Sequence, residues 1–287
     1  MFGVTRKKAG WDCMRHIEIM AAGCVPYFVD LDRLPKHTMQ FYPKDLLSRA
    51  KALDGVVHKG SFLDPASFSV DTTKINFTEY YEIATGILEH SRRHLTTRAM
   101  ATYVLRTINQ TSPNKALMAT SCVDDYLQDS ILHGLKIVLG TKLIDFVPAA
   151  DILAESGHCV LDASVREKML PDFRLNMYMD AWAAQSEKHF LSRQGYGKGY
   201  TVWNRLSHTL HVRRDTVVDD VLENRYDVIF LSYRMFGGPQ EDFLEIIRRS
   251  VPPEKVVIFV GGDLPASNTD LEKYSRIGSW IFEREIY

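Results

Sequence analysis

The chain has 287 residues, enough for two ordinary domains, and 45% of them are hydrophobic, so a sizeable core can form. Its 35 basic residues are balanced by 36 acidic ones. This balance excludes a general nucleic-acid-binding protein, which carries a basic excess, and we expect no nucleic acid partner. No apolar run approaches the roughly 20 residues that a membrane helix needs. The sequence therefore predicts no transmembrane segment.

The four cysteines are scattered without the CxxC spacing of a zinc site, at Cys13, Cys24, Cys122 and Cys159. Neither a disulfide framework nor a structural metal is expected, and reduced thiols are typical of a cytoplasmic protein. The N-terminus also lacks the long apolar core of a signal peptide. We therefore predict a cytoplasmic location.

The first segment of the chain is predicted to be largely helical. Apolar residues at helical spacing indicate a short helix within 12–22, with Gly23 as its C-cap, followed by a strand at Val25–Val29. Helical character returns over Tyr80–Ile108, with a break near Leu95–Thr97 that divides it into two helices. The polar stretch Asn109–Asn114 suits a linker, so we expect two domains, 1–112 and 113–287.

The second segment alternates strand-like and helix-like stretches. Strands are predicted at Lys115–Thr120, Lys142–Val147, Asp227–Ser232, Lys255–Gly261 and Ser279–Glu283. Helices are predicted at Asp124–Leu139, Thr216–Asn224, Gln240–Ser250 and Asp270–Ile277. This alternation predicts an α/β fold with a Rossmann-like, mainly parallel sheet and helices on both faces. Such sheets place ligands beyond the carboxyl ends of their strands.

A basic, glycine-containing loop leads into the first predicted helix. Lys7 and Lys8 precede Gly10, which we expect at the helix N-terminus, where free backbone N–H groups and the helix dipole favour a phosphate. Arg15 and Glu18 share one helical stripe with Trp11 and Ala22. An arginine can hold a diphosphate through two hydrogen bonds, and a carboxylate can accept sugar or ribose hydroxyls. The alternative is a surface ion pair between Arg15 and Glu18.

The N-terminal stretch resembles the donor-site signature of GT-B-type glycosyltransferases, both exostosin-like and glycosyltransferase family 1-like, including viral and microbial relatives. The resemblance covers about residues 3–50 and rests on Glu18, the turn Ala21–Pro26, Asp30–Pro35 and Phe41–Lys44. It implies a GT-B-like fold and hexosyl transfer from a nucleotide-diphosphate sugar to a glycan or other hydroxyl acceptor, with no metal or cofactor required. It also implies that Glu18 binds donor hydroxyls. The predicted donor-binding residues are Lys8, Gly10, Trp11, Arg15, His16, Glu18 and Gly23.

The second segment is similar to the N-terminal half of such enzymes, so the two halves come in reversed order. This order predicts a circular permutation, a fragment of a tandem enzyme or a truncated product, with residues 1–112 forming a partial donor-binding half. Residues predicted for the acceptor side are Asp125, His133, Gly262 and Asp263. The sequence identifies no catalytic base.

Three alternatives remain open. Asp125, Asp129 and His133 follow each other at intervals of four residues, which suits a metal or acid–base group, or simply a charged helix start. The glycine-rich stretch Gly195–Tyr200 is either a phosphate-binding loop or a flexible loop, and the flexible loop is favoured because the stretch lacks the strand–helix context of a dinucleotide fingerprint. The whole chain is either an enzyme or a non-catalytic remnant that binds a sugar nucleotide or a protein partner. A different Rossmann-like enzyme is disfavoured, because no GxGxxG follows the first strand.

Overall fold

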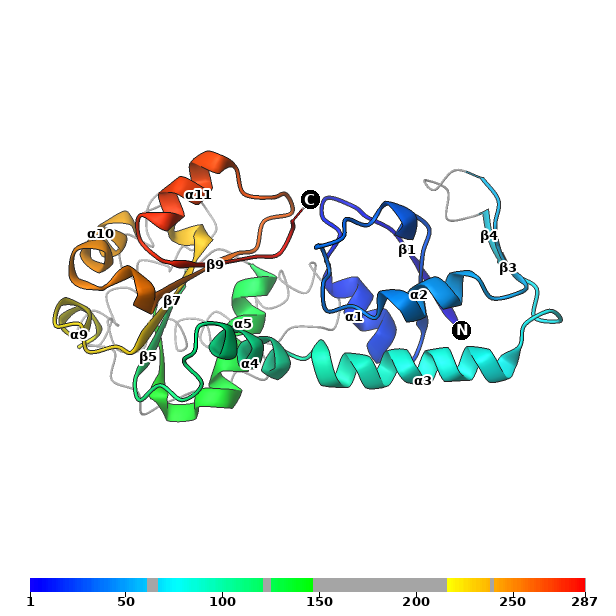
Figure 1. Ribbon diagram of the computed structural model, residues 1–287, viewed down its shortest axis with the longest axis horizontal. Coiled ribbons are helices and arrows are strands. Elements are labelled where there is room, and N and C mark those ends of the chain that lie inside the picture. Colours follow the sequence, from blue (N-terminus) through cyan, green and yellow to red (C-terminus); the bar gives the residue numbers. More distant parts are fainter. Residues whose placement is uncertain (61–66, 121–124, 147–215, 238–239, 287) are drawn as a thin grey trace, which may run out of the picture. The chain divides into compact units, whose positions relative to one another are not determined.

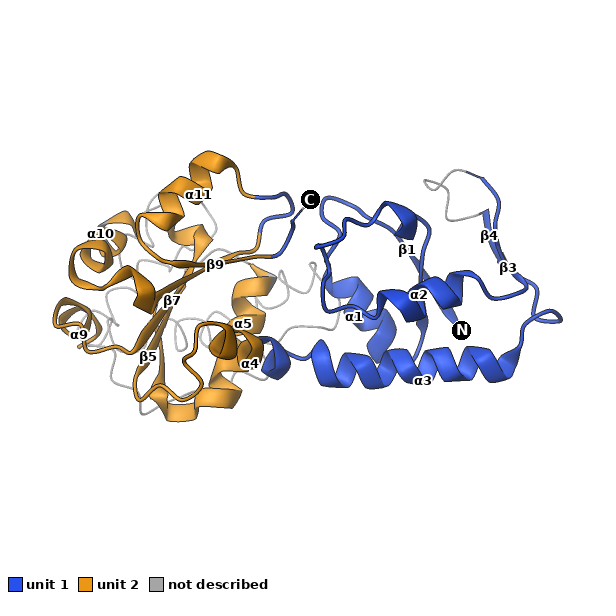
Figure 2. Ribbon diagram, in the orientation of Figure 1, with its two compact units in different colours: residues 1–100, 262–265, 284–287 blue, residues 101–261, 266–283 orange. Residues whose placement is uncertain are grey.

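The computed structural model describes residues 1–60, 67–120, 125–146, 216–237 and 240–286. The chain divides into two compact units (Figure 2). Unit 1 contains Met1–Met100, Gly262–Pro265 and Arg284–Tyr287, and unit 2 contains Ala101–Gly261 and Ala266–Glu283. The sequence places the join at Asn109–Asn114, whereas this division falls at Met100. Two short C-terminal segments also return to unit 1, and both follow a strand of unit 2. The glycine-rich stretch Gly195–Tyr200 lies outside the described residues.

Unit 1 begins with a parallel strand–helix–strand unit. It is formed by β1 (Phe2–Thr5), α1 (Met14–Ala21) and β2 (Val25–Phe28) (Figure 1). Phe2 lies opposite Val25 in the register, so the strand predicted at Val25–Val29 is confirmed. Every residue of β2 is buried, because this strand runs through the core of unit 1.

The other elements of unit 1 pack around this parallel pair. They are a 3-10 helix η1 (Leu31–Arg33), α2 (Lys44–Lys51), the antiparallel strands β3 (Val56–His58) and β4 (Phe68–Val70), and α3 (Phe77–His94). Met20 of α1, Leu47 of α2 and Ile83 of α3 are all fully buried in one apolar cluster. The unit therefore carries four short strands in its described part, where one or two are expected from the sequence.

The long helical stretch is divided in two as predicted. The helix α3 ends with Leu95 as its C-cap, and α4 spans Thr97–Thr107. The hydroxyl of Thr96 accepts a hydrogen bond from the N–H of Ala99 at 3.2 Å. This local contact satisfies one of the free donors at the start of α4, which favours a new helix at this point.

Unit 2 is built on a five-stranded parallel sheet, and this confirms the predicted α/β class. The strand order is β6-β5-β7-β8-β9. The strands are β5 (Ala116–Ala119), β6 (Leu143–Phe146), β7 (Val228–Ser232), β8 (Val256–Val260) and β9 (Trp280–Glu283). Every residue of β7 and β8 is buried, as expected for parallel strands whose two faces are both covered by helices.

Helices cover both faces of this sheet (Figure 1). They are α5 (Tyr126–Leu139), α9 (Val217–Leu222), α10 (Glu241–Ser250) and α11 (Asn268–Ser275), with short 3-10 turns at η3 (Gly140–Lys142), η6 (Tyr233–Met235) and η7 (Pro253–Lys255). Residues of α9, α10 and α11 share one core with Ile144 and Phe146 of β6. The intervening residue of that strand, Asp145, contacts Lys136 of α5, so α5 covers the opposite face.

Candidate functional site

The predicted donor site centres on the connection between β1 and α1. Residues 6–13, which we call the donor loop, leave the carboxyl end of β1 and lead into the helix that returns to β2. The carboxyl ends of parallel strands are where open α/β sheets bind ligands. The fold therefore puts the predicted basic loop at the position where a ligand would be expected.

The helix begins later than the sequence predicts. Its first residue is Met14, and Cys13 precedes it in an extended conformation without a side-chain cap. Gly10 is buried in the loop, four residues before the helix, so its predicted place at the helix N-terminus is wrong. Trp11 also precedes the helix and is buried in the core of unit 1, where the residue is only 4% exposed. The proposed helical stripe therefore holds only for Arg15 and Glu18.

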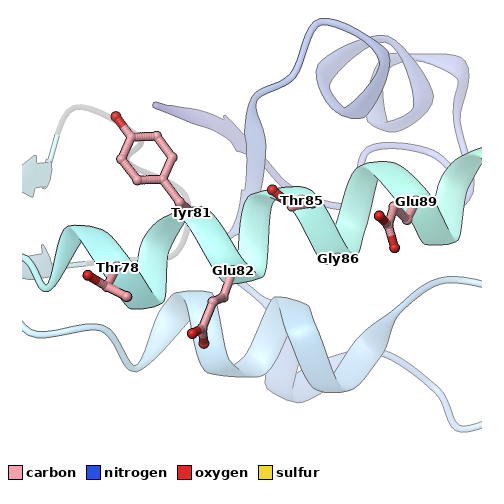
Figure 3. Close-up of a pocket in the computed structure, with 6 residues that line it drawn as sticks. All are labelled: Thr78, Tyr81, Glu82, Thr85, Gly86 and Glu89. Atoms are coloured by element: carbon pink, nitrogen blue, oxygen red, sulfur yellow. The ribbon is translucent and has the colours of Figure 1, made fainter.

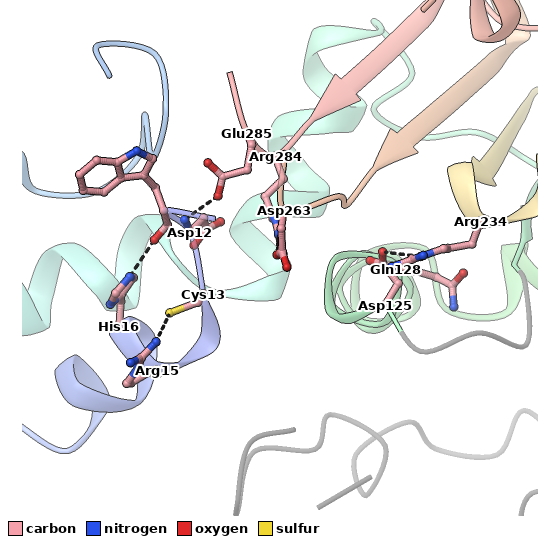
Figure 4. Close-up of polar contacts among 11 residues, drawn as sticks. Asp12, Cys13, Arg15, His16, Asp125, Gln128, Arg234, Asp263, Arg284 and Glu285 are labelled. Carbon is pink, nitrogen blue, oxygen red and sulfur yellow. Dashed lines mark hydrogen bonds and ion pairs between the residues drawn. The ribbon is translucent and has the colours of Figure 1, made fainter. Parts of the chain in front are cut away.

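Two buried carboxylates fix the backbone of the donor loop. The N–H of Lys7 donates to Asp30 Oδ2 at 3.0 Å, and the N–H of Asp12 donates to Glu285 Oε1 at 2.8 Å (Figure 4). Asp30 and Glu285 are 5% and 0% exposed. Tyr42 adds a third tie, because its hydroxyl donates to Asp12 Oδ1 at 2.9 Å. Buried charge-assisted bonds of this kind are strong, so the loop is held at both ends.

His16 has a structural position inside unit 1. Its Nε2 donates to the carbonyl oxygen of Trp11 at 2.8 Å, and its Nδ1 accepts from the hydroxyl of Thr5 at 3.1 Å (Figure 4). Burial lowers the pKa of His16 below its usual 6.5, which matches a neutral ring in this tautomer. Both ring nitrogens are engaged within the protein, so His16 connects the end of β1 to the donor loop.

The charged residues of the loop and of α1 remain more accessible. Lys8 is exposed, and Lys7 places its Nζ 5.9 Å from the centre of the Trp11 ring. Arg15 reaches back to the loop, where its guanidinium donates to Cys13 Sγ at 3.4 Å (Figure 4). Within the described part of the chain no ion pair joins Arg15 to Glu18. This disfavours the alternative that the two residues are a surface ion pair.

Glu18 has an unsatisfied oxygen. Its Oε1 is buried, and among the described residues no group donates a hydrogen bond to it. A buried acceptor left without a donor costs about 1–3 kcal/mol, and more when it is charged. Such an atom requires a donor, and a ligand hydroxyl is one group that can supply it.

Gly23 lies at the other end of α1 from the donor loop. Its φ of +73° is left-handed, and its N–H donates to the carbonyl of Met20 at 3.0 Å. A glycine in this conformation just past a helix end closes the last turn. This left-handed turn explains why residue 23 is a glycine, and Gly23 is confirmed as part of the C-terminal cap of α1.

The residues predicted for the acceptor side are divided between the two units. Asp125 and His133 belong to unit 2, whereas Gly262 and Asp263 belong to unit 1. Asp263 forms an ion pair with Arg284, and its carbonyl oxygen would lie 3.2 Å from a Cβ added to Gly10. The structure therefore places Asp263 beside the donor loop.

Asp125 is the N-cap of α5. Its Oδ1 accepts from the N–H of Gln128 at 3.0 Å, and Arg234 Nε lies 3.6 Å from its Oδ2 (Figure 4). Gly261 is packed so closely that a Cβ there would lie 2.4 Å from Asp125 Oδ1. His133 lies two helical turns further along α5. Among the residues that the structure describes, no group of three His, Cys, Asp or Glu side chains is placed to hold a metal ion.

Polar groups gather where strands β5 and β7 end. The chain changes the direction in which it adds strands to the sheet at β5. Its next strand, β6, pairs with one edge of β5, and the following strand, β7, pairs with the other edge. Such switch points are the usual ligand crevices of parallel sheets. Thr120 follows β5, and its buried Oγ1 has no partner in the described residues. Ser232 ends β7, and Arg234 follows it with a half-exposed side chain.

A shallow depression lies elsewhere in unit 1, on the exposed side of α3 (Figure 3). It is lined by Thr78, Tyr81, Glu82, Thr85, Gly86 and Glu89. None of the predicted site residues is among them. The charged groups on this single helix face are two acidic side chains, Glu82 and Glu89, which offer no positive charge for a diphosphate, so we do not place the site there.

Sequence reasoning does not reveal the residues that hold the donor loop. Glu285 contacts Asp12 across 273 positions of the chain, and no local pattern signals such a contact. Asp30 was identifiable in principle, since it follows β2 and a polar residue after a parallel strand points to the ligand edge. Arg284, whose side chain is 4% exposed, has no such signal.

Comparison with known proteins gave no relative, because no family model, no curated protein and no solved structure matches this chain. Among the described helices, none is long and apolar enough to cross a membrane. Cys13 and Cys24 are free thiols, and Cys122 and Cys159 lie outside the described residues. What the site does must therefore be inferred from its own chemistry.

Proposed function

We propose that the chain is a glycosyltransferase that binds a nucleotide-diphosphate sugar at the donor loop and the start of α1. The observation that carries this proposal is the buried Oε1 of Glu18, which has no donor within the described residues. Sugar hydroxyls are donors of the required kind. Glu18 lies on the helix that the donor loop enters, so one ligand with a phosphate end and a hydroxyl-rich end matches both features.

The positive groups of the loop would hold the diphosphate. Lys8 is exposed and Arg15 is partly exposed, so both can reach a ligand at the carboxyl end of β1. The N–H groups in the first turn of α1 donate no hydrogen bond to the side chain of Cys13 and add a positive dipole end. When the bond between sugar and diphosphate breaks, these groups stabilise the charge that develops on the leaving diphosphate.

In this proposal unit 2 contacts the acceptor, a glycan or another hydroxyl compound. The polar edge formed by Thr120, Asp125 and Arg234 offers one hydroxyl without a partner among the described residues and one partly exposed guanidinium. Both can hydrogen-bond a neutral, hydroxyl-rich molecule. We also propose a cytoplasmic location, which the free thiols of Cys13 and Cys24 support.

Calorimetric titration of site variants tests the assignment of Glu18. A thermal-shift screen of uridine and guanosine diphosphate sugars first selects the ligand, and the same sugar nucleotide and its bare nucleoside diphosphate are then titrated. Glu18→Ala should weaken binding of the sugar nucleotide about tenfold to a hundredfold, as expected for the loss of a charged hydrogen-bond partner. Binding of the bare diphosphate should change little, because Glu18 is proposed to hold only sugar hydroxyls.

Lys8→Ala provides the complementary result. It should weaken both ligands alike and reduce the dependence of their Kd on salt, because Lys8 is proposed to contact phosphate. Glu89→Ala and Lys36→Ala, at exposed positions remote in sequence from the loop, are the matched controls and should change neither Kd. Equal losses for both ligands on removing Glu18 would contradict its role. Binding without transfer to any acceptor would instead favour a non-catalytic binding module.

A further inference from the structure

The C-terminal segment 284–286 is anchored in unit 1 at three points. Arg284 forms an ion pair with Asp263. Glu285 Oε1 accepts the N–H of Asp12 at 2.8 Å, and the carbonyl of Ile286 accepts a hydrogen bond from the hydroxyl of Thr38. Arg284 and Glu285 are 4% and 0% exposed. These three polar contacts join the segment to unit 1.

The carboxylate of Glu285 lies directly against Gly10. A Cβ added to Gly10 would be 2.5 Å from Glu285 Oε1 and 3.1 Å from Glu285 Cδ. Real Cβ atoms do not approach other atoms so closely, and both of these lie in a buried side chain. Gly10 is therefore a glycine because Glu285 needs the space, and not because of its backbone conformation, since its φ is not among the positive ones.

The arrangement leaves one carboxylate oxygen unsatisfied. Glu285 Oε2 is buried, and no hydrogen bond from a described residue reaches it. Burial raises the pKa of Glu285 above its ordinary value, despite the hydrogen bond from Asp12. Burying a carboxyl group at this cost is unexpected if its only task were to fill space in the core. Its contacts indicate a task at the donor loop.

We propose that Glu285 is a positioning residue, which holds the donor loop in the shape that binds the diphosphate of the ligand. It accepts the N–H of Asp12, and Asp30 accepts the N–H of Lys7, so the two carboxylates hold both ends of the loop. Lys8 lies between these two ties and is thereby presented to solvent. The inference rests on the proposed function of the loop, but its structural half can be tested without any ligand.

Hydrogen exchange of the full-length chain tests the tie itself. The variants are Glu285→Ala, Glu285→Gln, Gly10→Ala and the double variant of Gly10→Ala with Glu285→Ala, and Glu272→Ala at an exposed position of α11 is the control. Removing Glu285 should speed exchange of the Asp12 amide and of the peptide 6–13 about tenfold to a hundredfold. Glu285→Gln keeps an acceptor oxygen for Asp12 and should stay within about threefold of the parent.

The double variant provides a coupling test. Gly10→Ala should free the loop because its methyl group displaces Glu285, so the double variant should exchange no faster than Glu285→Ala alone. Additive effects, or unchanged exchange in Glu285→Ala, would overturn the proposal. If Glu285→Ala does not fold, the exchange rates of Glu285→Gln and Gly10→Ala still show whether Glu285 holds the donor loop.

Binding of the same proteins to UDP and UDP-glucose separates the two proposals. Glu285→Ala should weaken both ligands by the same factor, because the loop holds their common diphosphate, and Glu285→Gln should restore binding. An open loop with unchanged Kd values would overturn the positioning role. If the parent binds neither ligand and the screen finds no other, the proposed function fails and the role of Glu285 at a diphosphate fails with it. The exchange data would then still report whether Glu285 holds the loop.

Discussion

The buried ion pair between α5 and β6 of unit 2 makes a quantitative prediction. Lys136 Nζ lies 3.1 Å from Asp145 Oδ2, and the two side chains are 7% and 1% exposed. Replacing Lys136 by Met keeps the aliphatic stem and leaves the carboxylate of Asp145 buried without this counter-charge. Breaking a buried pair on one side typically costs about 3–5 kcal/mol, so Lys136→Met should lose about this much free energy of unfolding.

The double variant with Asp145→Leu should recover most of that loss, because two apolar side chains can replace a buried pair without the cost of desolvating charge. Urea unfolding of the four proteins, followed by circular dichroism, gives the coupling free energy directly. Lys142→Met, at an exposed position six residues away, is the control and should change stability by less than about 0.5 kcal/mol. A loss below about 1 kcal/mol for Lys136→Met, or a double variant as unstable as the sum of the singles, would refute the reasoning.

Two further predictions concern buried groups with shifted pKa values. Burial holds the pKa of His16 below its ordinary value of 6.5 in the folded protein. The unfolded chain therefore binds a proton at this residue more readily than the folded chain does. The contribution of the neutral ring to the free energy of unfolding is complete above pH 6.5 and is lost as the pH falls below it. The slope of Tm between pH 7 and 5.5 should therefore be flatter in His16→Gln, and an unchanged slope would contradict this. Burial also raises the pKa of Tyr226, whose hydroxyl has no partner in the described residues. Tyr226→Phe should leave the urea midpoint unchanged or raise stability by up to about 1 kcal/mol, whereas a clear loss would mean that the hydroxyl is bonded.

Local patterns in the sequence predict much of the fold. The strands of unit 2 are apolar runs bounded by polar or glycine residues, such as Val256–Val260 before Gly261. The complete burial of the four strands β5, β6, β7 and β8 is typical of a parallel sheet covered on both faces, so the fold class could be derived. The break between α3 and α4 was also predictable, because Thr96 and Thr97 interrupt the apolar spacing and Thr96 caps the second helix.

The candidate site was predictable only in outline. Its location in the basic loop follows from the order of strand, loop and helix, but the start of α1 depends on how deeply Trp11 is buried. The burial of Trp11 is decided by tertiary packing and not by helix propensity. The tie between Asp12 and Glu285 depends on a C-terminal segment returning to unit 1. Contacts between positions so distant along the chain leave no periodic or motif signal in a single sequence.

Mapping of ligand-induced backbone amide shifts tests the proposed site most directly. The full chain, labelled with ¹⁵N, is titrated with the sugar nucleotide selected by thermal shift, and then with the bare diphosphate. We predict that the largest shifts fall on residues 6–15 with both ligands, and that the amides around Glu18 respond only to the sugar nucleotide. Saturable shifts confined to other parts of the chain, or no shifts with any nucleotide sugar, would contradict a donor site at this loop.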